Sequence, residues 1–280
     1  MTVTITPLAE HAGAEVTGLD LRDDVDSETA KRLNDAFVDR VALVFRDQTL
    51  TPQDFVKGAS IFGTPMKQLL AQYHLPDCPE VGVVSNRDRD TKGDGKILIR
   101  GTTWHTDHSN TAVPPKATSL YAVDLPDSGG DTAFTNTCAA YDALPRATKK
   151  RIDGLQAVHA YLSSRTPRKL PKRTKEEEAA SPDMIQPLVR THPDSGRKAL
   201  YLNPVRIEEF IGVEKEEGFS LLGELMAHAT EDRFIYRHKW RRGDMVIWDN
   251  RCSMHQANKD YDMSQLRLMH RLMLEGTKPV

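Results

Sequence analysis

The sequence predicts a mainly β protein with helices inserted between some of its strands, arranged as a sandwich or jelly roll. Two observations favour this class. Many short apolar or alternating segments are separated by turn residues, and no glycine-rich fingerprint follows any of them, as a Rossmann fold would require. The length of 280 residues fits one such domain. We therefore expect a single domain over residues 1–280.

Strands are expected where an apolar or alternating run ends at a turn signal. The continuous apolar run 41–45 is typical of a buried strand, and the segments on either side of the Pro, Asp and Gly residues at 192–196 are typical of a hairpin. In chain order, the predicted strands are 3–7, 14–21, 41–45, 81–85, 117–123, 131–135, 156–162, 188–191, 198–202, 233–240, 245–249 and 267–275.

Helices are expected where apolar residues recur at helical spacing after a capping residue. Ser27 is a suitable N-cap for the first helix, and Thr51 followed by Pro52 marks the start of the second. The predicted helices are 30–41, 52–61, 138–155 with a break at Pro145, and 217–230. Residues 163–183, rich in Arg, Lys, Glu and Pro, predict either a solvated loop or a mobile lid over an active site.

The amino-acid composition limits the kinds of function that the protein can have. Hydrophobic residues make up 39% of the chain and charged residues 28%, with a formal net charge of −2, so a nucleic-acid partner is not expected. No segment is long and apolar enough to span a membrane, and the N-terminal segment lacks the pattern of a signal peptide. The chain has 3 cysteines, Cys78, Cys138 and Cys252. Their odd number and wide spacing argue against a disulfide framework, and we expect a cytoplasmic protein.

The residue pair His105 and Asp107 is a candidate metal site. In an extended segment both side chains lie on the same face. His255 follows a strand that is expected to end at Asp249, and a polar turn is expected to present it. Two imidazoles and one carboxylate are the ligands of a non-haem Fe(II) centre with open positions. Taken alone, each of these residues also has an ordinary structural interpretation.

The last strand contributes two arginines, Arg267 and Arg271, which alternate with Met269 and Met273 on one face. Guanidinium groups on an apolar face are costly unless they are paired, usually with carboxylates. The partners are either structural acidic residues or small anionic ligands. Thr132 follows a glycine turn at 129–130, and its hydroxyl is placed to donate to a carboxylate that Arg267 holds.

Together, these motifs resemble the taurine dioxygenase/TfdA family of Fe(II)- and 2-oxoglutarate-dependent dioxygenases. The C-terminal half is similar to the branch that oxidises phenoxyacetate herbicides. The resemblance covers nearly the whole chain in the right order, and it rests on Trp104-His105-Thr106-Asp107, Gly129-Gly130-Asp131-Thr132, Trp248-Asp249-Asn250-Arg251 with His255, and then Arg267 and Arg271.

The resemblance implies a double-stranded β-helix core, that is, a jelly roll of the cupin type. It also implies Fe(II), 2-oxoglutarate and O2 as cofactor and cosubstrates, and a dimer or tetramer. The site residues that it implies are His105, Asp107 and His255 for iron, Thr132 and Arg267 for the distal carboxylate of 2-oxoglutarate, Arg271 for the anionic group of the substrate, and Tyr73 and His74 on the substrate side, although the region of these last two departs from the family motifs.

The expected reaction is hydroxylation of a small organic anion at a C–H next to a heteroatom, with release of succinate and CO2. An aryloxyalkanoate-like carboxylate and an alkylsulfonate both fit. The carboxylate of Asp107 disfavours halogenation, because the related halogenases lack it. One alternative is a zinc hydrolase on the same three ligands, which needs a general base and has no use for Thr132 and Arg267. A second is a non-enzymatic jelly roll that binds an anion.

Overall fold

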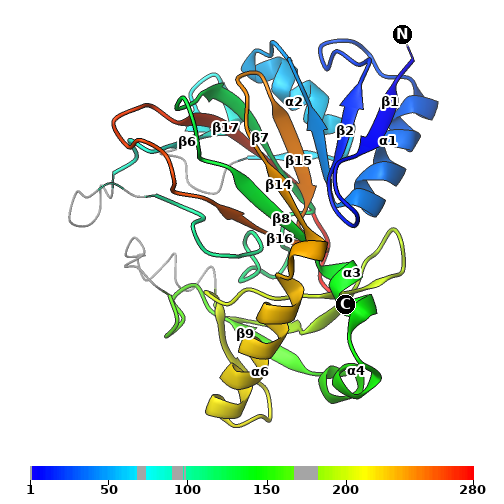
Figure 1. Ribbon diagram of the computed structural model, residues 1–280, viewed down its shortest axis with the longest axis vertical. Helices are drawn as coiled ribbons and strands as arrows, with labels where there is room; N and C mark the ends of the chain where they lie inside the picture. The colour runs from blue at the N-terminus through cyan, green and yellow to red at the C-terminus, as the bar shows by residue number, and fades with distance from the viewer. Residues whose placement is uncertain (1, 68–73, 90–96, 98, 167–181) are drawn as a thin grey trace.

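Two sheets, built mainly from antiparallel strands, face one another at the centre of the molecule (Figure 1). The computed structural model describes residues 2–67, 74–89, 97, 99–166 and 182–280. The major sheet has the order β1-β2-β3-β15-β7-β17-β6-β5, with β4 paired to β17, and the minor sheet has the order β14-β8-β16. The bounds of the major-sheet strands are β1 Thr4–Pro7, β2 Ala14–Thr17, β3 Ala42–Phe45, β4 Pro65–Met66, β5 His74–Leu75, β6 Cys78–Ser85, β7 Ala117–Asp124, β15 Met245–Asp249 and β17 Leu268–Leu274. The minor-sheet strands are β8 Thr132–Asn136, β14 Ile235–His238 and β16 Ser253–Ala257.

Strand β3 of the major sheet is buried on both faces, as the apolar run 41–45 predicts. Leu43 and Phe45 of β3 pack against the helices α1 (Ser27–Arg40) and α2 (Pro52–Ser60). The alternate residue Val44 lies in a different cluster with Phe134 of the minor sheet. Because strand side chains alternate between faces, one face of β3 meets the helices and the other fills the space between the two sheets.

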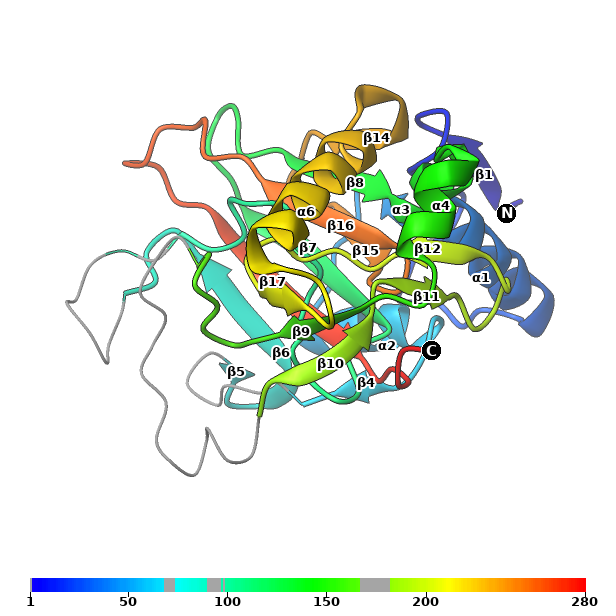
Figure 2. The ribbon, with the colours of Figure 1, turned by 90° about the horizontal axis from the view of Figure 1, so that it is seen from below.

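A third group of elements covers the outer face of the minor sheet. Met254 of β16 packs with Leu222 and Leu225 of α6 (Lys215–Ala229), and Figure 2 shows α6 lying along this side of the molecule. The remaining elements of this region are α3 (Thr137–Ala143), α4 (Arg146–Ile152), the sheet β10-β9-β13 (Met184–Pro187, Gln156–His159, Ile207–Phe210), the hairpin of β11 (Val189–Thr191) and β12 (Lys198–Leu200), and the short 3-10 helix η2 (Asp232–Phe234).

Several expected boundaries differ from the structure. The N-cap of α1 is Asp26, not Ser27, because the Asp26 carboxylate accepts from the backbone N–H of Thr29. Thr51 caps α2 as expected and forms a full capping box with Asp54. The expected strand 233–240 is shorter, since η2 occupies its start. Strands β10 and β13 were not expected, because neither has a clear alternating pattern in its sequence.

The expectation of a lid at 163–183 falls mostly outside the described residues. Its first residues are described, and the hydroxyls of Ser163 and Thr166 donate to the backbone carbonyl of Val205. The single-domain expectation stays a prediction. Among the described residues, no helix has the length and apolar character that crossing a membrane requires.

The glycine turn before β8 depends on a close backbone approach. Gly129 and Gly130 have φ values of 77° and 72°, a conformation that favours glycine. The backbone N–H of Gly130 donates to Asp260 Oδ1 at 2.8 Å. A Cβ on Gly129 would lie 2.4 Å from the carbonyl oxygen of Asp260. The turn therefore fits against the segment that leads to Arg267 only without a side chain.

We predict that Gly129→Ala destabilises the protein more than Gly154→Ala does. Gly154 has a similar φ of 71°, but its Cβ would meet nothing within 4 Å. The control should therefore lose only the backbone term, about 1 kcal/mol, whereas Gly129→Ala should lose a further 1–3 kcal/mol, roughly, from overpacking. Urea unfolding of both variants measures the difference, and equal losses would contradict the close approach.

Candidate metal centre

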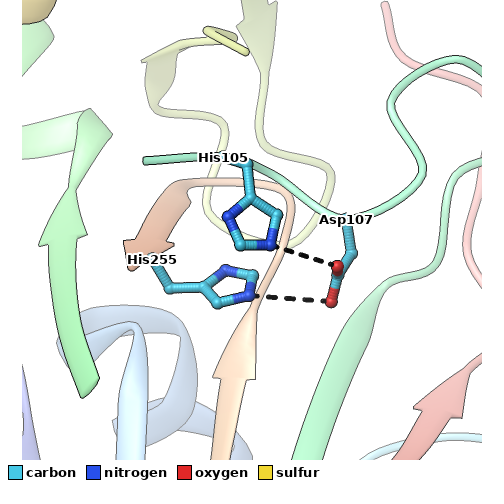
Figure 3. A group of neighbouring side chains, drawn as sticks. All are labelled: His105, Asp107 and His255. Carbon is cyan, nitrogen blue, oxygen red and sulfur yellow. Dashed lines mark ion pairs between the residues drawn. The ribbon is translucent and has the colours of Figure 1, made fainter. Parts of the chain in front are cut away.

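The structure brings His105, Asp107 and His255 together between the two sheets (Figure 3). His105 Nε2 lies 3.7 Å from Asp107 Oδ1, and His255 Nε2 lies 3.9 Å from Asp107 Oδ2. The three ligand atoms lie within 4.8 Å of one another. The expected turn at His255 is wrong, because His255 lies within β16 and the turn ends before it. The strand gives its side chain a fixed direction toward the other two.

Backbone pairing fixes the two histidines relative to one another. The N–H of His105 donates to the carbonyl of His255 at 3.0 Å, and the N–H of His255 donates to the carbonyl of His105 at 2.9 Å. Their ring centroids are 4.1 Å apart. His105 Nδ1 lies 2.8 Å from the carbonyl of Thr103, so Nδ1 carries the proton and Nε2 keeps its lone pair. This is the tautomer that binds a metal through Nε2.

The electrostatics favour metal-binding protonation states. Burial lowers the pKa of His255 to about 3, with a contribution from His105, and burial lowers the pKa of His105 as well. Burial alone raises the pKa of Asp107, but His255, Arg271 and His105 outweigh it and bring that pKa below its usual range. Near neutral pH the site thus presents two uncharged imidazoles and one carboxylate, the forms that bind a metal. This donor set fits Fe(II).

A second group, His192, Asp249 and Cys252, also has metal-ligand residue types but is a satisfied hydrogen-bond network. Backbone N–H groups of Asp194 and Ser195 donate to His192 Nδ1. His192 Nε2 therefore carries the proton and donates to Asp249 Oδ2 at 3.0 Å. The carboxylate of Asp249 also accepts from the guanidinium of Arg251 at 2.8 and 2.6 Å. Its lone pairs are occupied, so this group has a structural role.

Arg267 contacts the glycine turn that leads into β8, and Thr132 is the first residue of that strand. Arg267 is 8% exposed, and its guanidinium donates to the carbonyl of Gly130 at 3.2 Å. In the described part of the chain, no carboxylate pairs with Arg267. Trp240 Nε1 donates to Thr132 Oγ1 at 3.0 Å, which leaves the hydroxyl proton of Thr132 for another acceptor. A buried guanidinium and a hydroxyl donor without an acidic partner are suited to an anionic ligand.

Arg271 lies close to the metal ligands, since its charge acts on Asp107. β17 begins at Leu268, directly after Arg267, and pairs with β6 without interruption as far as Arg271. His74 pairs with Gly82 in β6, and Gly82 pairs with Arg271 in β17. His74 and Arg271 therefore occupy one cross-strand row, with a residue without a side chain between them. Tyr73 lies outside the described residues.

Two further residues, His108 and Arg206, lie near the site. His108 follows the ligand Asp107 directly and has a φ of 49°. Burial lowers its pKa to about 4, and the charges of Arg271 and Arg206 act in the same direction. The charge of Arg206 also acts on His105. A positive φ at a non-glycine residue beside a metal ligand is the kind of strain that gathers at functional sites, but it is not readable from sequence.

Comparisons with known proteins agree with this geometry. The family model described as taurine catabolism dioxygenase TauD, TfdA family, matches residues 4–273. The chain is 34% identical over 280 residues to the alpha-ketoglutarate-dependent 2,4-dichlorophenoxyacetate dioxygenase of Cupriavidus pinatubonensis, with 97% of each protein covered. It is 34% identical to the alpha-ketoglutarate-dependent sulfate ester dioxygenase of Pseudomonas putida, with 99% of this chain and 90% of that protein covered.

Solved structures show the same likeness. The structure of AAD-2 in complex with Mn(II) and N-oxalylglycine is similar with a TM-score of 0.84 and 35% identity, over 100% of this chain and 99% of the other. A taurine dioxygenase from Burkholderia xenovorans is similar with a TM-score of 0.84 and 31% identity, over 100% and 91% of the two chains. The expected jelly-roll core and the expected use of Fe(II), 2-oxoglutarate and O2 are confirmed. The chain belongs to the TauD/TfdA family and is a 2-oxoglutarate-dependent dioxygenase.

Proposed function

We propose that this dioxygenase hydroxylates a small organic anion at a C–H next to a heteroatom. His105, Asp107 and His255 hold Fe(II). Arg267 and Thr132 bind the distal carboxylate of 2-oxoglutarate, and Arg271 binds the anionic group of the substrate. The observation that carries the proposal is the buried guanidinium of Arg267, which has no acidic partner in the described ranges. A zinc hydrolase on the same ligands has no use for it.

When bound, the iron supplies the oxidation of 2-oxoglutarate to succinate and CO2, coupled to hydroxylation of the substrate carbon by O2. The residues position the reactants. Arg267 and Thr132 fix the far end of 2-oxoglutarate, so its keto acid end lies toward the triad. Arg271, whose charge acts on Asp107, places the substrate anion beside the metal. If the neighbouring heteroatom is an ether or ester oxygen, the hydroxylated carbon is hemiacetal-like and fragments.

Two features support an anionic substrate with such a carbon. The relatives are named for 2,4-dichlorophenoxyacetate, (S)-phenoxypropionate and sulfate esters, which are all anions with a carbon bonded to oxygen. In this chain, His74 and Arg271 share one row across Gly82, at a spacing of roughly 10 Å for two strand widths. We assign His74 to the substrate side with Arg271, and Tyr73 remains a prediction from the sequence.

We further propose a cytoplasmic homo-oligomer. Cys78, Cys138 and Cys252 are all free and buried, which suits a reducing compartment. A dimer or tetramer is the expectation that the family resemblance carries, and light scattering of the purified protein decides between these states and a monomer.

The first test of the proposed function concerns the triad. Wild-type protein with Fe(II), ascorbate, 2-oxoglutarate and a panel of aryloxyalkanoates, alkylsulfonates and sulfate esters should form succinate. His105→Ala should lower this rate by at least about 100-fold, because a ligand of the metal is lost. His11→Ala is the control, since His11 is a partly exposed histidine beside Glu10 that belongs to neither the triad nor the arginine pair. The assignment of this site to oxygenase chemistry would be contradicted if the protein contained zinc and formed no succinate with any member of the panel.

The second prediction separates the two arginines. Arg271→Ala should raise the KM for the organic substrate by about 10–100-fold, the value of one charge-assisted hydrogen bond of about 1.5–3 kcal/mol. Its KM for 2-oxoglutarate should stay nearly unchanged. Arg267→Ala should show the opposite pattern. Steady-state kinetics with each reactant varied in turn measures both, and a reversed pattern would mean that the two roles are exchanged.

A further inference from the structure

A buried hydroxyl lies directly beneath the carboxylate of the candidate iron ligand Asp107. Thr118 lies on β7 of the major sheet and is fully buried. Its Oγ1 donates to Asp107 Oδ2 at 2.7 Å. Among the described residues this is the only hydrogen bond to that carboxylate. Oδ1 lies 3.7 Å from His105 Nε2, and Oδ2 lies 3.9 Å from His255 Nε2. Both oxygens therefore face a histidine of the triad, and they differ in that Oδ2 alone accepts a hydrogen bond from a described residue.

Thr118 is itself the end of a hydrogen-bond chain. Trp248 Nε1 donates to Asn250 Oδ1 at 3.1 Å, and Asn250 Nδ2 donates to Thr118 Oγ1 at 2.9 Å. These three residues are almost completely buried, so each polar group needs its partner. The chain joins β15 and the turn after it to β7, and it ends on the metal ligand.

The direction of this chain is fixed by the chemistry of its first member. An indole N–H can only donate, so Trp248 must meet the amide oxygen of Asn250. The amide nitrogen of Asn250 then points to Thr118 and donates to its oxygen. The single hydroxyl proton of Thr118 is left for Asp107, and it requires an acceptor there. The chain thus favours the ionised carboxylate and keeps its donor on Oδ2.

Trp248 also contacts a second ligand. Its ring centroid lies 4.6 Å from that of His255, at an interplanar angle of 52°. One buried residue therefore limits the rotation of the His255 ring and begins the chain that ends on Asp107. Groups beyond the ligands that orient them commonly set metal affinity.

We propose that Trp248, Asn250 and Thr118 act as positioning residues that keep Asp107 a one-oxygen ligand, bound to the metal through Oδ1. This inference rests on the proposed metal role of the triad. With Oδ2 held by Thr118, the carboxylate would bind the metal through one oxygen and leave positions for the keto acid end of 2-oxoglutarate and for O2. Without the Thr118 hydroxyl, the carboxylate would be free to rotate away from the metal, which would weaken metal binding. Oδ2 would also be free to compete with 2-oxoglutarate for a metal position, which would weaken binding of the cosubstrate.

The test compares Thr118→Val, which keeps the shape and removes the hydroxyl, with Thr118→Ser, which keeps the hydroxyl. The control is Ser119→Ala. Ser119 is the next residue in β7 and is equally buried, but its hydroxyl donates to the backbone carbonyl of Val246 at 3.0 Å. The measurements are calorimetric titration of the metal-free protein with Mn(II), then titration of the Mn(II)-loaded protein with 2-oxoglutarate without O2, and the melting temperature.

Thr118→Val should bind Mn(II) about 10–100-fold more weakly, the range for removal of a group that orients a ligand, and should bind 2-oxoglutarate more weakly as well. Thr118→Ser and Ser119→Ala should stay within about threefold of wild type, since both keep the chain to Asp107. A purely structural role for Thr118 would lower the melting temperature and leave both affinities unchanged, and that result overturns the proposal.

A second variant decides the matter if Thr118→Val does not fold. Trp248→Phe keeps a ring against His255 but lacks the indole N–H, so the orientation of Asn250 is no longer fixed. It should bind Mn(II) several-fold more weakly, and wild-type affinity would overturn the proposal. Failure of the metal site itself looks different. In that case wild type does not bind Mn(II), or His105→Ala binds it equally well, whatever the Thr118 variants do.

Discussion

The negative charge of Asp107 is the constraint on which the arrangement of the two sheets depends. A carboxylate that is 8% exposed is costly unless charges and hydrogen bonds surround it. The major sheet supplies Thr118 and Arg271, and the minor sheet supplies His255. Because each sheet contributes groups that face Asp107, moving the sheets apart would separate His255 from the carboxylate that it faces. The same contacts that form the metal centre therefore fix the spacing of the jelly roll.

Strand β15 and the turn after it connect the metal-ligand region to the rest of the core. Val246 and Trp248 face the minor sheet. Asp249 is held by Arg251 of the next turn and by His192 of the loop between β11 and β12. This buried ion pair fixes the path of the chain from β15 into β16, and β16 carries His255. The segment 248–251 thus has two roles. Its carboxylate anchors the turn, and its indole and amide lead to the metal ligand.

Features that depend on neighbouring residues were predicted from the sequence, whereas features that depend on pairing between distant segments were not. The buried strand β3, the Thr51 cap and the hairpin at 192–196 each follow from neighbouring residues. The placement of His255 within a strand does not, because β16 forms by pairing with β8 more than a hundred positions away in the sequence. The triad was predictable as a set of residue types. Its support by Thr118 was not, since nothing in the sequence indicates that β7 lies beneath Asp107.

The charges of the proposed site point to the class of its substrate. A site enclosed by protein is most stable when its charges nearly balance. Fe(II) and the carboxylate of Asp107 leave one positive charge, and Arg267 and Arg271 each add another. Fully ionised 2-oxoglutarate carries two negative charges, so positive charge remains even before Arg206 is counted, whose charge acts on His105 and His108. An anionic substrate would offset this charge, which favours a carboxylate, a sulfonate or a sulfate monoester over a neutral molecule and is consistent with the position of Arg271, whose charge acts on Asp107.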